Sequence, residues 1–281
     1  MELHQIYKPI TATPFYRDRT HIEIEPCLEL KPYIRCFWGS ITPYHQTASA
    51  TQSLVIPDSC MDIIFDINFT LNTITSSFYG INDSTFTVDH ANDKSMLIST
   101  FGIRFYAWSA VLFSEESMNL VKNEHFSVEY HFPKLKRELE PLLFEITNIY
   151  QIVAIVEKYL LNLIHHNKEN TLVMKAVSEI LQSKGNLKIL NLHKELHTST
   201  RQIERLFREY VGISPKQFSS LVRYQYLWNS IVNEPNFNTL DKVYQLGYTD
   251  QAHMLNDFKR FHTMTPSSAK ELALNYVAFL Q

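Results

Sequence analysis

The alternation of apolar and polar positions near the C-terminal end of the chain occurs twice, 51 residues apart. The apolar positions are Ile203, Leu206, Phe207 and Tyr210 in the first copy and Met254, Leu255, Phe258 and Phe261 in the second. Helical i, i+3, i+4 spacing of this kind predicts an amphipathic helix. A good N-cap residue, Ser199 or Asp250, precedes each stripe, and Pro215 or Pro266 follows that cap by sixteen residues. The repeat indicates two copies of one small supersecondary unit.

Each copy is preceded by a shorter predicted helix, over 187–196 in the first and 239–246 in the second. A short turn separates the two helices of each copy, so both copies predict a helix-turn-helix. The segment 215–232 lies between the copies and predicts a helix that links them.

The region up to residue 132 has the pattern of a β structure instead. Its short runs, rich in β-branched and aromatic residues, lie at 54–57, 61–67, 72–79, 84–88, 96–100 and 102–108. Asn-Asp, Pro-Asp and Asp-His turn signals separate them, and many short strands at close spacing predict a barrel or roll. From 133 to 166 the period becomes helical, with one apolar stripe from Ile149 to Ile164. This stripe predicts either a helix lying on the barrel or a subunit interface.

The predicted fold class is α+β, in three parts. Residues 1–132 form an N-terminal, mostly-β sensor or assembly domain with flanking helices, and 133–170 form connecting helices and a hinge. Residues 171–281 form an all-α domain with two helix-turn-helix units joined by a linker helix. We expect this last part to fold as a separate unit.

Charge is divided unevenly between these parts. The whole chain has a net charge of −3, but residues 171–281 hold 13 Lys and Arg against 9 Asp and Glu, a net charge of +4. Residues 1–170 therefore hold 13 basic and 20 acidic residues, a net charge of −7. The chain thus joins a basic C-terminal region to an acidic N-terminal region. Because +4 is a modest charge, affinity for DNA should depend on a localised basic face and not on net charge.

Composition describes an ordinary globular chain, with 45% hydrophobic and 20% charged residues among 281. No run approaches 18 apolar residues and the first residues lack a secretory signal, so we expect no membrane helix and a cytoplasmic location. Cys27, Cys36 and Cys60 include no Cys-x-x-Cys motif, which predicts buried free thiols. His193 and His197 are four residues apart, but Lys194 stands where a zinc protease has its glutamate. We therefore predict no catalytic residue, no metal site and no cofactor.

The segment from Leu172 to Leu274 contains a combined pattern of short motifs, at residues 202–207 (QIERLF), 212–215 (GISP), Arg223, 246–253 (LGYTDQAH), 257–260 (DFKR) and 265–266 (TP). By these motifs the segment resembles the DNA-binding domain of the AraC/XylS family of transcription regulators. Segments 32–38, 55–65 and 101–105 resemble a sensor-type domain often found ahead of it, and the family's cupin-like barrels agree with the predicted β region by analogy. The resemblance implies a bacterial, sequence-specific regulator of transcription that is not an enzyme.

It also implies that each second helix enters a major groove of double-stranded DNA. The candidates for reading base edges are Arg201, Glu204 and Arg205 in the first unit and Gln251, His253 and Asn256 in the second. Glu204 either accepts a hydrogen bond from a cytosine or holds an arginine in place. The candidates for phosphate contact are Ser199, Arg208, Lys216, Lys259 and Arg260.

Further expected partners are a second copy of the chain, RNA polymerase and a small-molecule effector. The candidate effector pocket comprises Arg35, Trp38, Arg104 and Trp108, because a mostly apolar pocket with a few polar groups is the usual form of such a site. The opposing interpretation is that these aromatics are core and the charges are either exposed or paired with each other. The alternative function is an interaction protein whose N-terminal barrel binds another protein, with DNA binding secondary or lost.

Overall fold

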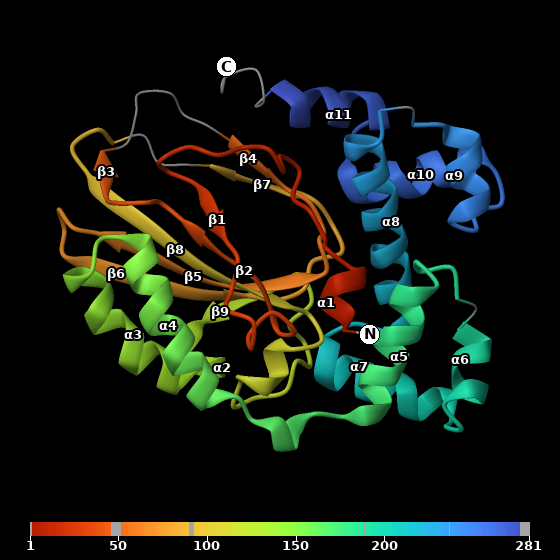
Figure 1. Ribbon diagram of the computed structural model, residues 1–281, viewed down its shortest axis with the longest axis horizontal. Helices are drawn as coiled ribbons and strands as arrows, with labels where there is room; N and C mark the ends of the chain where they lie inside the picture. The colour runs from red at the N-terminus through yellow and green to blue at the C-terminus, as the bar shows by residue number, and fades with distance from the viewer. Residues whose placement is uncertain (1, 46–51, 90–92, 188, 236, 276–281) are drawn as a thin grey trace.

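The computed structural model describes residues 2–45, 52–89, 93–187, 189–235 and 237–275 (Figure 1). A β domain of strands β1–β9 stands beside a helical domain of helices α5–α11, as predicted. An N-terminal arm, residues 2–12 with the short helix α1 (Leu3–Ile6), runs between the two domains.

The main sheet of the β domain is antiparallel, with the strand order β1-β2-β8-β5-β6-β9 and β3 paired to β8. Its strands are β1 (Ile22–Ile24), β2 (Ile34–Gly39), β3 (Tyr44–His45), β5 (Cys60–Asn68), β6 (Thr73–Tyr79), β8 (Leu97–Tyr106) and β9 (His125–Ser127). A separate ribbon of β4 (Gln52–Val55) and β7 (Phe86–Asp89) lies on the far side of the roll from helices α3 and α4 (Figure 1). The two runs predicted at 96–100 and 102–108 form one strand, β8, because Gly102 continues the ladder without a turn.

Position 102 requires a glycine because the Trp38 side chain leaves no room for a Cβ there. The indole of Trp38 lies across it from β2, and a Cβ at position 102 would come within 2.2 Å of that ring. Residues on β5 and β8 alternate between the two faces of the sheet. Phe65, Phe101 and Phe105 are buried on one face, whereas Asp62 and Arg104 point to the other.

Helices cover the apolar face. These are α2 (Val128–His131), α3 (Pro133–Glu145) and α4 (Ile149–Leu163). In the stripe on α4, Ile152, Val156 and Leu160 are buried within the single chain. The stripe therefore packs on the β domain, and Tyr150 and Leu161 are left exposed on the outer side of the helix.

The helical domain begins beyond the short 3-10 turn at His166–Lys168. Its helices are α5 (Thr171–Gln182), α6 (Ile189–Glu195), α7 (Thr200–Val211), α8 (Pro215–Asn233), α9 (Thr239–Gln245), α10 (Gln251–His262) and α11 (Pro266–Asn275). Helix α8, the predicted linker, starts with a capping box in which Ser214 and Gln217 bond reciprocally. Asn170 caps α5 directly after the predicted hinge, and the amide of His165 donates to Leu112 of the β domain at 2.9 Å.

None of the helices in the described part of the chain is long and apolar enough to cross a membrane.

Candidate DNA-binding surface

The first helix-turn-helix consists of α6 and α7, joined by the turn at 196–199. The Ser199 hydroxyl accepts a hydrogen bond from the amide of Gln202 at 3.2 Å, as expected of an N-cap. Ile203, Phe207 and Val211 are buried, so the apolar stripe fixes which side of α7 faces outward. The outward side carries Arg201, Arg205 and Arg208, all exposed.

Two of these arginines are held by acidic residues one turn away on the same helix. Arg205 lies 2.9 Å from Glu209, and Arg208 lies 3.7 Å from Glu204. Glu204 therefore holds an arginine in this structure, which is one of the two roles considered for it. Both arginines remain about two-thirds exposed, at 65% and 64%, so the pairs are weak and leave them available to a phosphate or a base.

The second unit, α9 and α10, has the same arrangement. The Asp250 carboxylate accepts from the amide of His253 at 2.7 Å and caps α10. Gln251, His253 and Asn256 are exposed on the outer face of the helix. Both caps, both stripes and both outward faces lie where the sequence repeat placed them.

The caps differ in charge, however. Ser199 is neutral, whereas Asp250 is acidic, and a carboxylate at a helix N-terminus repels a phosphate that would otherwise bind there. The first unit therefore offers a better N-terminal phosphate contact than the second.

Among the predicted phosphate contacts, Lys216 and Lys259 are exposed, at the start of α8 and near the end of α10. Arg260 is 58% exposed, but its guanidinium lies 2.9 Å from Asp257 and 4.1 Å from the centroid of the Phe261 ring. Asp257 is buried and also contacts Arg223 at 3.2 Å. Arg260 is therefore partly engaged in holding the second unit together.

Sequence reasoning missed one buried polar contact in that unit. His262 is fully buried, and its Nδ1 lies 2.8 Å from the hydroxyl of Tyr224 on α8. Burial lowers the pKa of His262 to about 4, so the imidazole is neutral near pH 7. The signal was its position at the end of the apolar stripe, one residue beyond Phe261.

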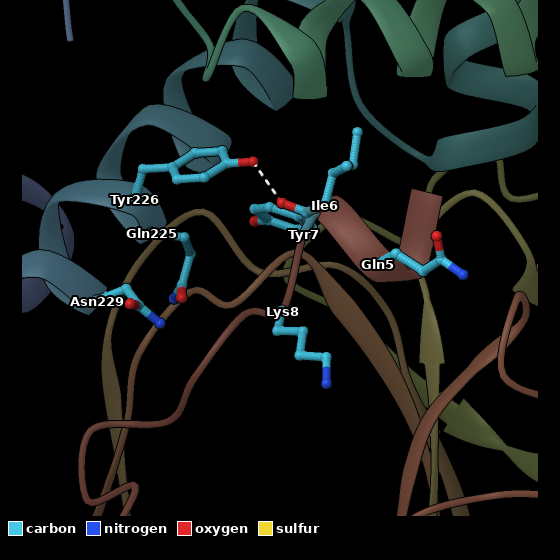
Figure 2. A pocket seen from close by; sticks show the side chains of 7 residues that line it. All are labelled: Gln5, Ile6, Tyr7, Lys8, Gln225, Tyr226 and Asn229. Carbon is cyan, nitrogen blue, oxygen red and sulfur yellow. Dashed lines mark hydrogen bonds between the residues drawn. The ribbon is translucent and has the colours of Figure 1, made fainter. Parts of the chain in front are cut away.

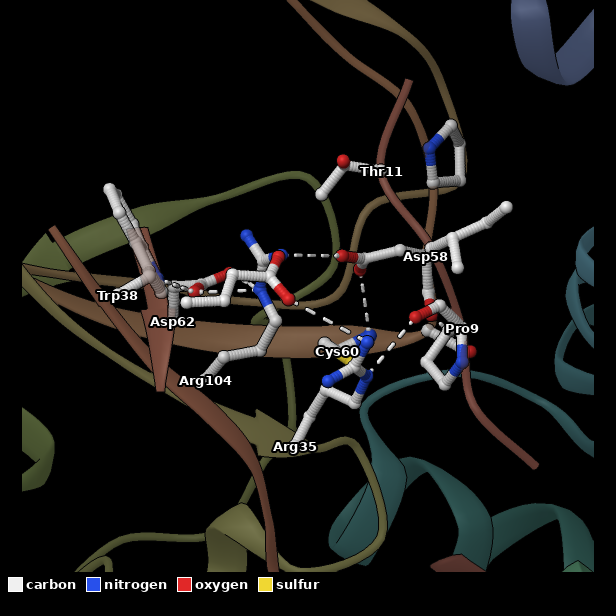
Figure 3. Close-up of polar contacts among 12 residues, drawn as sticks. Pro9, Thr11, Arg35, Trp38, Asp58, Cys60, Asp62 and Arg104 are labelled. Atoms are coloured by element: carbon white, nitrogen blue, oxygen red, sulfur yellow. Dashed lines mark hydrogen bonds and ion pairs between the residues drawn. The ribbon is translucent and has the colours of Figure 1, made fainter. Parts of the chain in front are cut away.

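None of the four residues of the candidate effector pocket lines either of the two cavities found between the arm and α8 and between β6, β9 and α3. Arg104 lies between two carboxylates of the chain, 3.0 Å from Asp62 and 3.6 Å from Asp58 (Figure 3). The Trp38 indole donates to Asp62 at 2.8 Å. Burial raises the pKa of Asp58, although Arg104 beside it acts in the opposite direction. An anionic ligand at Arg104 would have to displace one of these carboxylates.

The other two residues also have partners within the chain. Arg35 donates to the carbonyl of Pro9 in the N-terminal arm at 3.2 Å and lies 3.7 Å from Glu23 (Figure 3). Trp108 is buried outside this network, stacked on Tyr106 at 4.5 Å between centroids and edge-on to Phe218 of α8. The charges are thus paired with one another and Trp108 belongs to the core.

A cavity of about 230 Å³ lies instead between the arm and helix α8 (Figure 2). Its lining residues are Gln5, Ile6, Tyr7, Lys8, Gln225, Tyr226 and Asn229. The hydroxyl of Tyr226 donates to the carbonyl of Ile6 at 2.7 Å along its upper side (Figure 2). A second, polar cavity of about 460 Å³ lies between β6, β9 and α3.

Comparison with known families gives two matches. Residues 192–271 match a family described as a helix-turn-helix domain, and residues 22–127 match a domain of unknown function (DUF6597). No curated protein matches the chain.

Among solved structures, the chain is similar to an AraC-type transcriptional regulator from Chromobacterium violaceum, at 19% identity and a TM-score of 0.32, covering 36% of this chain and 91% of that one. It is also similar to ToxT from Vibrio cholerae, at 14% identity and a TM-score of 0.41, covering 92% and 96%. ToxT bound to an unsaturated fatty acid aligns at 11% identity and a TM-score of 0.40, covering 82% and 93%.

The family resemblance predicted from the sequence is confirmed by the helix-turn-helix match. Residues 192–271 form an AraC-type helix-turn-helix domain, the kind of domain by which transcription regulators bind DNA.

Proposed function

We propose that α7 and α10 read two successive major grooves of one operator. The observation that carries this proposal is the duplicated unit: two capped helices, each with a buried apolar stripe and an exposed polar face, joined by the single helix α8. Successive major grooves on one face of B-DNA are about 34 Å apart, so the operator has two half-sites about one helical turn apart.

Base reading is assigned to Arg201, Arg205 and, more weakly, Glu204 on α7, and to Gln251, His253 and Asn256 on α10. Arginine recognises guanine through two parallel hydrogen bonds, and Asn or Gln recognises adenine in the same way. Ser199, Arg208, Lys216, Lys259 and Arg260 are assigned to phosphates, which set the register without reading sequence.

The test is selection of bound fragments from a random DNA library by the full-length protein. Enriched sequences with two conserved blocks, about 10–10.5 base pairs from centre to centre, are the expected result. A single conserved block, or enrichment without any consensus, contradicts the two-groove proposal.

In second place we propose control by a small organic anion at the cavity between the arm and α8. The specific observation is that this cavity is lined by both the N-terminal arm and helix α8, and that Lys8 is the charged residue among the described residues of its lining. A ligand there would contact the arm and the linker helix together, so it would favour one interdomain arrangement over others. Dimerisation and contact with RNA polymerase stay predictions.

A thermal-shift screen of small mono- and dicarboxylic acids on the full-length protein tests this second proposal. An acid that raises the melting temperature of the wild type but not of Lys8→Gln supports it. Acids that have no effect, or that stabilise Lys8→Gln equally, contradict it.

A further inference from the structure

The C-terminal ends of both recognition helices are contacted by the β domain. The last four carbonyls of any helix have no partner within that helix and need donors from elsewhere. At the end of α7, the carbonyl of Glu209 accepts from the backbone amide of Met118 at 2.8 Å. At the end of α10, the carbonyl of Phe261 accepts from the hydroxyl of Thr85. One domain thus supplies a donor to the same part of each recognition helix.

The approach at α7 is close. Gly212 ends this helix with a φ of 83°, in the left-handed region that favours glycine. A Cβ on Gly212 would lie 2.7 Å from a methyl group of Val121 and 3.2 Å from one of Ile81. The loop from β8 to β9 and the loop from β6 to β7 both reach this helix end.

These two loops are tied into one unit. The amide of Asp83 donates to the side chain of Asn123 at 2.9 Å, and Asn123 donates back to the Asp83 carboxylate at 2.8 Å. Lys122 lies 2.7 Å from the same carboxylate. Residues 81–85 and 118–123 together are called the bracket below.

The bracket also reaches the start of the linker helix. Gln217, in the first turn of α8, donates to the Asp83 carboxylate at 3.5 Å. The bracket therefore contacts the end of α7, the end of α10 and the helix that joins them. If the two helix-turn-helix units were joined only by α8, each could rotate relative to the other. A second attachment of both units to the bracket restricts that rotation.

We propose that the bracket fixes the orientation of α7 relative to α10 and so determines which spacing of DNA half-sites the chain accepts. In this proposal Asp83 and Thr85 are positioning residues that act on DNA recognition without touching DNA. The proposal rests on the reading of two grooves for its effect on DNA, but its structural part is measurable without DNA.

The structural part is tested by amide hydrogen exchange of the full-length protein. Thr85→Val keeps the shape of the side chain and removes its donor, and Asp83→Ala unties the two loops. Both should speed exchange in the last turn of α10 by roughly two- to tenfold, the equivalent of one net hydrogen bond. Thr87→Val, at an exposed position on β7, is the matched control and should leave exchange in α10 unchanged. Equal exchange in all four proteins overturns the proposal.

The effect on DNA is tested with the selected operator and derivatives that carry one or two extra base pairs between the half-sites. Wild type and Thr87→Val should lose affinity steeply along this series, and Thr85→Val and Asp83→Ala should lose it less steeply. If the affinity of these variants falls with inserted base pairs as steeply as that of the wild type, the proposal is overturned. If the wild type itself shows no dependence on spacing, the two-groove reading fails, and the exchange experiment alone then decides whether the bracket holds α10.

Discussion

At the scale of single residues, the DNA contacts proposed for α7 and α10 divide into groups that would read sequence and groups that would bind any DNA. Arg201 and Arg205 lie one turn apart near the N-terminal half of the helix, and Lys259 lies in the last turn of α10. Arg201→Ala and Arg205→Ala should each weaken binding to the selected operator by about 1–3 kcal/mol and relax preference at separate base positions.

Lys259→Ala is the comparison for that experiment. It should weaken binding to all sequences similarly and lower the slope of log K against log salt by about 1. Competition binding with single-base operator variants measures both effects. Arginine variants that keep wild-type discrimination would show that the reading face has been assigned wrongly.

A second prediction at this scale concerns His262. Its folded pKa of about 4 lies below the value near 6.5 expected for an unfolded chain, so the unfolded state binds the proton more readily. The contribution of His262 to the free energy of unfolding is therefore fully present above pH 6.5. It falls as the pH drops from 6.5 towards 4, by about 3 kcal/mol at most. His131, buried in the β domain with a pKa of about 4, adds a similar dependence there.

Urea denaturation at pH 7.5 and pH 5 measures this dependence. His262→Phe should reduce the difference between the two pH values, because the variant has no group to protonate at this position. His197→Gln, at an exposed site in the turn between α6 and α7, is the matched control. A pH dependence in His262→Phe equal to that of the control would contradict the assignment.

At the scale of elements, the two recognition helices differ in their N-cap residues, Ser199 and Asp250. Exchanging one cap residue for the other allows the effect of the cap on stability to be measured separately from its effect on DNA affinity. Ser199→Ala removes the cap and should cost about 1 kcal/mol of stability. Ser199→Asp keeps a cap, as Asp250 does in α10, so stability should stay near that of the wild type. The added charge should nevertheless weaken DNA binding if Ser199 faces a phosphate. Thermal melts and operator titrations of both variants decide the matter, and unchanged affinity in Ser199→Asp removes Ser199 from the phosphate contacts.

The elements that the sequence predicted well are those defined by local signals. Ser199 and Asp250 cap helices within the next three residues, so their positions are visible in one short stretch of sequence. The network of Arg104 with Asp58 and Asp62 depends on strand pairing between β5 and β8, and that register is not readable from either strand alone. Trp108 lies beyond the end of β8 and is buried apart from these charges, stacked on Tyr106, so its place could not be read from its nearness to Arg104 in the sequence.

At the scale of the whole molecule, helix α8 is held by the N-terminal arm as well as by its own domain. Gln225 bonds to Ile10 at 2.9 Å, Tyr226 to Ile6 at 2.7 Å, and the Trp228 indole to the carbonyl of Thr11 at 2.9 Å. The sequence predicts that residues 171–281 fold as a separate unit. A fragment of these residues lacks the arm that contacts α8 in the intact chain.

We predict that this fragment folds as a helical unit with a lower melting temperature than the intact chain and binds the operator less tightly. Circular dichroism during heating, with anisotropy titrations of the operator, measures both. A fragment as stable and as tight-binding as the intact chain would show that the arm contributes nothing to α8, whereas a fragment without a cooperative melt would show that the two domains form one folding unit.

Hydroxyl-radical footprinting on the selected operator measures whether one chain places its two recognition helices in two successive major grooves, as we propose. The wild type should protect two patches on one face of the duplex, about one helical turn apart. Arg201→Ala should weaken protection of one patch, and Gln251→Ala protection of the other. A single protected patch in the wild type, or loss of the same patch in both variants, would contradict the account.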